Sequence, residues 1–107
     1  MADMTRFAPR VLIVEDDPST RELIRFHLTS AGYEIEESGE GAAAIVRAME
    51  RVFQLIVLDL QLPDVDGIVV CRAIRHTGAN RETPILMVAG RATEADKVAG
   101  LESGADD

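Results

Sequence analysis

The sequence predicts an α/β domain built on an open parallel sheet with helices on both faces. Short apolar runs alternate along the chain with segments of helical periodicity, which is the order of βαβ units. These runs contain no polar residue, as expected for strands that are buried on both faces of a parallel sheet. With 107 residues, the chain has room for one domain.

Four segments are expected to form strands. Three are continuous apolar runs rich in β-branched residues, at residues 11–14, 55–58 and 85–88. The fourth, at residues 33–37, alternates in residue type and is therefore expected at an edge of the sheet. The connections between parallel strands are expected to be right-handed crossovers.

Four segments are expected to form helices, at residues 19–31, 41–51, 67–75 and 93–103. The first has marked ends, with Asp17 or Ser19 as N-cap, Pro18 in its first turn and Gly32 as C-cap. Its apolar residues at helical spacing are Leu23, Ile24, Leu28 and Ala31. The last begins with Thr93 and Asp96 in a capping-box pattern and stops before Gly104.

Composition excludes several classes of function. The net charge of −8, from 19 acidic and 11 basic residues, argues against direct nucleic-acid binding, which needs clustered Lys and Arg. No run approaches the roughly 20 apolar residues of a membrane span. A single cysteine, Cys71, excludes an intrachain disulfide. We therefore expect a soluble, cytoplasmic chain that does not associate with membranes.

Carboxylates follow two of the predicted strands. Glu15, Asp16 and Asp17 come directly after the first strand, and Asp59 ends the third. Ligands of open parallel sheets bind beyond the carboxyl ends of the strands, so these side chains would meet if the two strands are neighbours. Helix capping is the favoured explanation for Asp17, but it does not explain Asp59, whose charge at the end of a buried strand is costly.

A hard divalent cation would compensate the charge of Asp59. Mg²⁺ typically takes one or two carboxylates together with waters and the oxygens of a phosphate. An aspartate beside such an ion can attack phosphorus and form an aspartyl phosphate. The pattern therefore indicates a phosphoryl-transfer site.

Three motifs resemble the receiver domain of bacterial two-component response regulators, in order and in spacing. They are Glu15-Asp16-Asp17-Pro18, the run from Leu58 to Gly67, and the run from Gly100 to Asp107. The resemblance covers residues 9–107 and leaves residues 1–8 as an N-terminal extension. It implies a flavodoxin-like fold with strand order 2-1-3-4-5. The final motif is most similar to receivers that precede a winged-helix DNA-binding domain.

The resemblance also implies the roles of individual residues. Asp59 matches the phospho-acceptor, and Asp16 matches a direct Mg²⁺ ligand. Glu15 matches a residue that acts through metal-bound water, and the backbone carbonyl of Gln61 matches the third protein ligand. The expected partner is a sensor histidine kinase, and the expected output is a response such as transcription.

The sequence departs from the family at two places. Ala89 stands where receivers carry Thr or Ser, whose hydroxyl contacts the phosphoryl group, so the conformational response is put in doubt. Thr93 is better explained as a cap than as a substitute hydroxyl.

The second departure concerns the end of the chain. The family's site lysine, fifth strand and fifth helix would lie beyond Asp107, and Lys97 lies too early to be that lysine. We therefore expect a C-terminally incomplete receiver. Its strand at residues 85–88 would be covered by further residues or by a second copy in a homodimer.

Two other classes of function remain open, a receiver-like interaction domain and an enzyme, either a phosphohydrolase or a flavin carrier. A receiver-like interaction domain that works without phosphorylation is favoured by Ala89 and by the absent lysine. A Mg²⁺-dependent phosphohydrolase would need a second Asp at position 61, which is Gln. A flavin carrier would need an anion-binding loop after the first strand, where this chain is acidic. The sequence thus favours a switch over an enzyme.

Overall fold

The computed structural model describes residues 8–76 and 78–88, and it contains the elements that the sequence predicts there. Each described element begins and ends within one residue of its predicted bounds, and the helix expected at residues 93–103 lies outside the described residues. The elements in chain order are β1 (Arg10–Val14), α1 (Pro18–Ser30), β2 (Glu34–Ser38), α2 (Gly41–Glu50), β3 (Leu55–Asp59), α3 (Gly67–His76) and β4 (Ile85–Val88).

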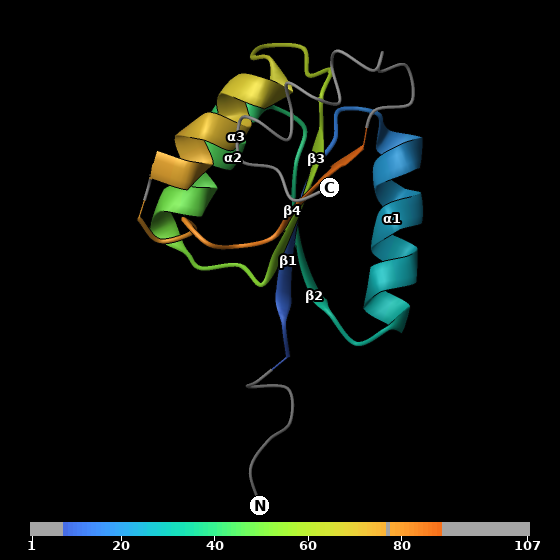
Figure 1. Cartoon of the computed structure of the whole chain (residues 1–107). Helices are drawn as coiled ribbons and strands as arrows, with labels where there is room; N and C mark the ends of the chain where they lie inside the picture. Colours follow the sequence, from blue (N-terminus) through green and yellow to red (C-terminus); the bar gives the residue numbers. More distant parts are fainter. Residues whose placement is uncertain (1–7, 77, 89–107) are drawn as a thin grey trace, which may run out of the picture.

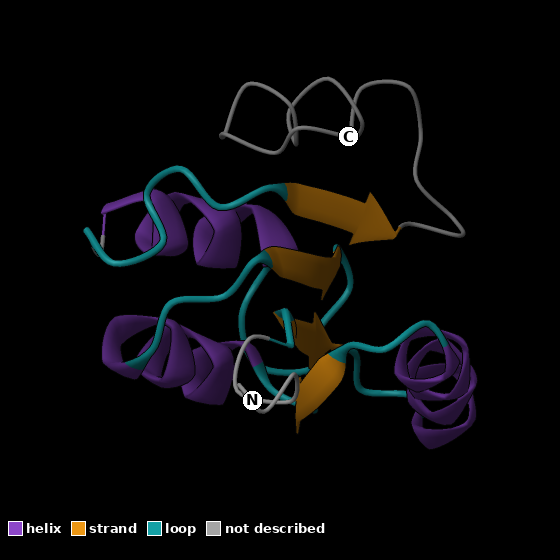
Figure 2. Ribbon diagram, turned by 90° about the horizontal axis from the view of Figure 1, so that it is seen from below, coloured by secondary structure: helices purple, strands orange, loops and turns teal. Residues whose placement is uncertain are grey.

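The four strands form one parallel sheet in the order β2-β1-β3-β4. This confirms the predicted order for these strands and places β2 at an edge. Helix α1 covers one face of the sheet, and α2 and α3 cover the other (Figures 1 and 2). Strands β1 and β3 are neighbours, with Val14 paired to Leu58, so the residues that follow them reach the same edge.

The two faces of β1 explain why its apolar run is unbroken. Leu12 and Val14 pack into the core beneath α2 and α3, whereas Val11 and Ile13 pack with Val57 beneath α1. All four of the apolar β1 side chains are fully buried. A strand covered on both sides has no polar face, so a period of two does not appear in its sequence.

Helix α1 has Asp17 rather than Ser19 as its N-cap, and its C-cap is Ala31, one residue before the predicted Gly32. The Asp17 carboxylate accepts a hydrogen bond from the Thr20 amide at 3.1 Å, and Gly32 has a φ of 97° just past the helix. The buried stripe is narrower than expected, because Ile24 and Leu28 pack on the sheet while Leu23 is 59% exposed.

The three described helices contain 13, 10 and 10 residues. Within residues 8–76 and 78–88, none has both the length and the apolar character that crossing a membrane requires. Each helix instead lies along the sheet (Figure 1).

Candidate metal centre

Three carboxylates meet at the carboxyl edge of the sheet. Glu15 and Asp16 follow β1, Asp59 ends β3, and each offers one oxygen that lies within 4.8 Å of the other two. The pairing of β1 with β3 brings them together, as the sequence predicts. Asp17 is not part of this group, because its carboxylate caps α1. Three oxygens at this spacing can hold one divalent cation.

Glu15 is the buried member of the cluster. The residue is only 9% exposed, and its side-chain Oε2 atom has no hydrogen-bond partner. Burial raises the pKa of Glu15 to about 8, and hydrogen bonding to Asp59 and the charges of Asp59, Asp16 and Asp17 add to the shift. An unpartnered carboxylate oxygen inside a protein is costly unless a cation compensates it. The donor set therefore fits a hard metal ion.

The backbone around Asp59 is tightly packed. The amide of Gln61 donates to the Asp59 Oδ1 atom at 3.1 Å, and the amide of Gly67 donates to the Leu60 carbonyl at 2.9 Å. A Cβ atom on Gly67 would overlap the Asp59 carbonyl oxygen and lie 2.7 Å from the Leu60 Cα. Helix α3 thus starts against the backbone of Asp59 because Gly67 has no side chain.

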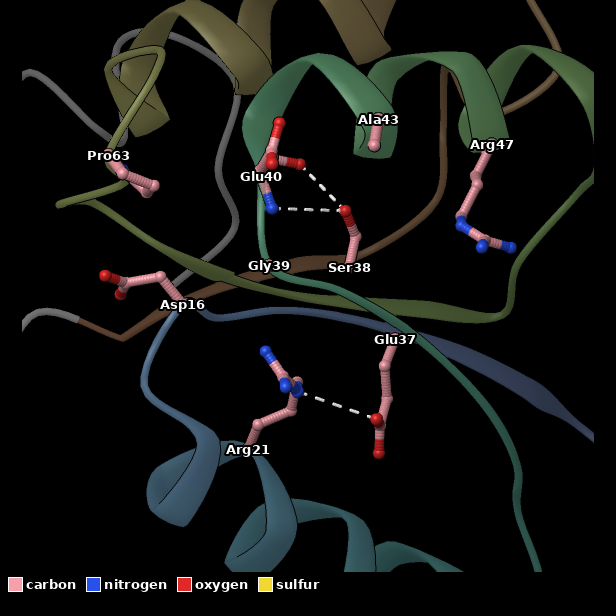
Figure 3. Close-up of a pocket in the computed structure, with 9 residues that line it drawn as sticks. All are labelled: Asp16, Arg21, Glu37, Ser38, Gly39, Glu40, Ala43, Arg47 and Pro63. Carbon is pink, nitrogen blue, oxygen red and sulfur yellow. Dashed lines mark hydrogen bonds and ion pairs between the residues drawn. The ribbon is translucent and has the colours of Figure 1, made fainter.

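Arg21 supports the other side of the cluster. Its guanidinium donates to the Glu15 backbone carbonyl at 2.8 Å and forms an ion pair with Glu37 at 3.5 Å. Arg21 and Asp16 line a hollow of about 690 Å³. The hollow lies next to the start of α2 (Figure 3). Sequence reasoning does not identify Arg21, because a surface position on a helix gives no signal of a bond to a loop carbonyl six residues earlier.

The remaining predicted site residues are not tested by the geometry. Gln61 is exposed and lies two residues beyond Asp59, where its carbonyl is the expected third ligand. Ala89, Thr93 and Lys97 lie outside the described residues.

Known sequences similar to this chain include a family model and full-length transcriptional regulators. A family model described as the response regulator receiver domain matches residues 11–107. The DNA-binding dual master transcriptional regulator RpaA of Synechocystis sp. is 38% identical over 99 residues, which are 92% of this chain and 41% of that protein. The transcriptional regulatory protein ResD of Bacillus subtilis is 42% identical over 98 residues, with 92% and 40% covered. The chain thus spans about two fifths of the length of these regulators.

Solved structures agree with the sequence comparison. The receiver domain of the sensor histidine kinase PA1611 from Pseudomonas aeruginosa PAO1, with a magnesium ion coordinated in its active-site cleft, superposes with a TM-score of 0.86 at 30% identity, and the match covers 94% of this chain and 82% of that one. The chemotaxis protein CheY4 of Vibrio cholerae gives a TM-score of 0.86 at 32% identity, with 92% and 82% covered.

Proposed function

The chain belongs to the family of response regulator receiver domains, and on that basis we propose that it is a phosphorylation switch in which Asp59 accepts a phosphoryl group. The observation that carries the proposal is the cluster of Glu15, Asp16 and Asp59, with its buried and unpartnered Glu15 oxygen. A merely structural cluster would be expected to pair its buried oxygens, because unpaired ones destabilise the fold.

The proposed roles of the site residues are those that membership of the receiver family implies. Asp16 and Asp59 would bind Mg²⁺ directly with the carbonyl of Gln61, and Glu15 would act through metal-bound water. The bound ion supplies positive charge that neutralises and orients the incoming phosphoryl group. Between transfers, that charge also offsets the mutual repulsion of the three carboxylates, which are otherwise held together by the pairing of β1 with β3.

The transfer itself is a substitution at phosphorus. A carboxylate oxygen of Asp59 forms a bond to phosphorus while the bond between phosphorus and the donor breaks, and the donor leaves with the electron pair. The donor is a phosphohistidine of a sensor histidine kinase, whose imidazole nitrogen is the leaving group. The Asp59 Oδ1 accepts a hydrogen bond from the Gln61 amide at 3.1 Å, which orients the carboxylate for this attack.

The phosphoryl group is the signal rather than a product. We propose that residues 9–107 form the receiver, with residues 1–8 as an extension. The full-length protein passes the signal to transcription through an output domain, as the names of RpaA and ResD suggest by analogy. In this function the domain is a switch that works in the cytoplasm, and it neither releases a small-molecule product nor contacts DNA itself.

Intact mass spectrometry tests the acceptor. We expect the chain to gain one phosphoryl group when it is incubated with Mg²⁺ and acetyl phosphate, and to gain none when Mg²⁺ is chelated. Asp59→Asn should abolish the gain, whereas the matched variant Asp17→Asn, which removes a charge two residues from Glu15, should retain it. A phosphoryl group on Asp59→Asn would overturn the assignment.

Ala89 favours a second candidate, a receiver that acts through protein contacts without phosphorylation. The two candidates differ in their response to phosphorylation. Amide exchange of phosphorylated wild type and of Ala89→Thr separates them, because a restored hydroxyl should enlarge the phosphorylation-dependent change. Absence of any phosphoryl gain in the wild type would favour the second candidate.

A further inference from the structure

The loop between Asp59 and α3 is joined to a distant helix by one side chain. The two carboxylate oxygens of Asp64 accept hydrogen bonds from the first two amides of α2, from Gly41 at 2.8 Å and from Ala42 at 3.0 Å. These partners are 23 and 22 residues away in the sequence. We infer that Asp64 is a positioning residue of the acidic site, which holds the loop after Asp59 in the shape that metal binding needs.

Helix α2 depends on this contact for its first turn. Its N-cap residue, Glu40, makes no side-chain hydrogen bond to the helix, although the first amides of a helix need partners from outside. Asp64 provides them, and a negative charge at this position is also favoured by the helix dipole. The two amide bonds hold the pKa of Asp64 below its ordinary value, so the carboxylate stays charged at neutral pH.

The start of α2 packs against the same loop without a gap. A Cβ atom on Gly41 would lie 2.7 Å from a methyl of Val70, 3.1 Å from the Cβ of Val65 and 3.3 Å from a methyl of Leu62. The helix is therefore in contact with residues on both sides of Asp64. A shift of the loop toward α2 is blocked, and a shift away would break both hydrogen bonds.

The loop is thus held at three points. Its start is held by the bond between the Gln61 amide and Asp59, its middle by Asp64, and its end by the bond from the Ile68 amide to the Asp66 carboxylate at 2.9 Å. The Gln61 carbonyl, the expected third metal ligand, lies between the first two points. Removing the middle point frees the segment that carries this carbonyl.

This inference rests on the proposed function and concerns the geometry of the same site. Residues that orient a ligand from outside the first coordination sphere typically change metal affinity about 10–100-fold when lost. We expect Asp64→Ala to weaken Mg²⁺ binding about tenfold, at the lower end of that range. Asp64→Asn should have a smaller effect, because its amide oxygen can still accept one of the two hydrogen bonds.

A matched control separates the contact from the charge. Glu40 carries the same charge at the same helix end but makes no side-chain bond to the helix, so Glu40→Gln should leave Mg²⁺ affinity unchanged. Calorimetric titration with Mg²⁺ gives the affinities. Hydrogen exchange at the Gly41 and Ala42 amides reports whether the contact is lost, and the rate of phosphorylation by acetyl phosphate is measured at Mg²⁺ concentrations below and above saturation.

The outcomes separate the inference from the function on which it rests. The expected result is weaker Mg²⁺ binding in Asp64→Ala, with a phosphorylation rate that recovers at saturating Mg²⁺. Wild-type Mg²⁺ affinity in Asp64→Ala together with faster exchange at Gly41 and Ala42 would overturn the positioning role and leave the function standing. If the wild type gains no phosphoryl group, the proposed function fails, and the calorimetric comparison still decides the role of Asp64. Should Asp64→Ala not fold, Asp64→Asn against Glu40→Gln makes the same decision.

Discussion

Two buried polar side chains, Asn80 and Glu15, lie at opposite ends of the strands and differ in their hydrogen bonds. Asn80 is fully buried before β4, where its Oδ1 accepts from the Phe53 amide at 2.8 Å. Its Nδ2 donates to the carbonyls of Ala48 at 2.6 Å and Arg51 at 2.7 Å. At the carboxyl edge, Glu15 is nearly as buried, yet its Oε2 has no partner.

The difference shows that the end of the strands near Asn80 is structural and that the carboxyl end near Glu15 is open to a ligand. A buried amide with both donor hydrogens and its acceptor oxygen bonded stabilises the fold and has no capacity left for another molecule. A buried carboxylate with an unpartnered oxygen destabilises the fold until a cation arrives. Substitutions at the two ends should therefore change stability in opposite directions.

The largest effect is expected from Asn80→Asp, which keeps the shape of the side chain but places a carboxylate oxygen against the carbonyls of Ala48 and Arg51. Losing two donated hydrogen bonds and burying a charge should lower the free energy of unfolding by about 3 kcal/mol or more. Urea denaturation followed by circular dichroism measures the change. A loss of less than about 1 kcal/mol would mean that Asn80 is not the structural tie described here.

Asp59→Asn should have the opposite sign. Removing the Asp59 charge relieves its repulsion of Asp16 and of Glu15, whose pKa it raises, so we expect the metal-free domain to gain about 1–2 kcal/mol. The variant should also lose the stabilisation that Mg²⁺ gives the wild type. Urea denaturation with Mg²⁺ and with a chelator measures both effects. A variant that is less stable than the wild type in chelator would show that the carboxylates do not repel one another.

Asp17→Ala tests whether the sign of the stability change depends on the contacts of the individual carboxylate or only on its place in the acidic segment. Asp17 adjoins Asp16, but it caps α1 through the Thr20 amide. Its loss should therefore lower stability by about 1 kcal/mol, with or without Mg²⁺. Thermal unfolding in both conditions measures this. A gain in stability like that of Asp59→Asn would show that Asp17 acts as a member of the repelling acidic cluster and not as a helix cap.

A change of pH should act on stability without any substitution. Because the pKa of Glu15 is raised from 4.5 to about 8, folded metal-free protein binds more protons than unfolded protein in this window, and its stability should fall as pH rises from 4.5 to 8. The pKa values of Asp17 and Asp64 are lowered from 3.8, so their contributions should be lost as pH falls below that value. Saturating Mg²⁺ should remove the upper slope, since the bound ion requires deprotonated carboxylates. A metal-free stability that is flat between pH 4.5 and 8 would contradict the raised pKa of the buried Glu15. Urea denaturation across pH measures these slopes.

The sequence predicts whatever is encoded locally. Apolar runs and caps such as Asp17 locate the elements, and the rule for parallel sheets predicts that Asp16 and Asp59 meet. Helical periodicity does not give the width of a buried stripe, which is why Leu23 is expected inside and lies largely exposed.

The contacts that hold the site depend on long-range packing. Asp64 meets Gly41 across 23 residues, and Asn80 meets Ala48 across 32. Asn80 stands among turn-forming residues, where an asparagine is ordinarily explained by the turn itself. No local pattern distinguishes such a residue from one that is buried and fully bonded, so only the folded structure identifies it.

Asp64 and Asn80 also define the mechanics of α2. Asp64 holds the first turn of the helix, and Asn80 binds the carbonyls of Ala48 and Arg51 at its end. The helix is about 15 Å long, and hydrogen bonds from side chains outside it hold both of its ends. We therefore expect a displacement of Asp64 to reach the Asn80 end of the strands as a shift or tilt of the whole helix.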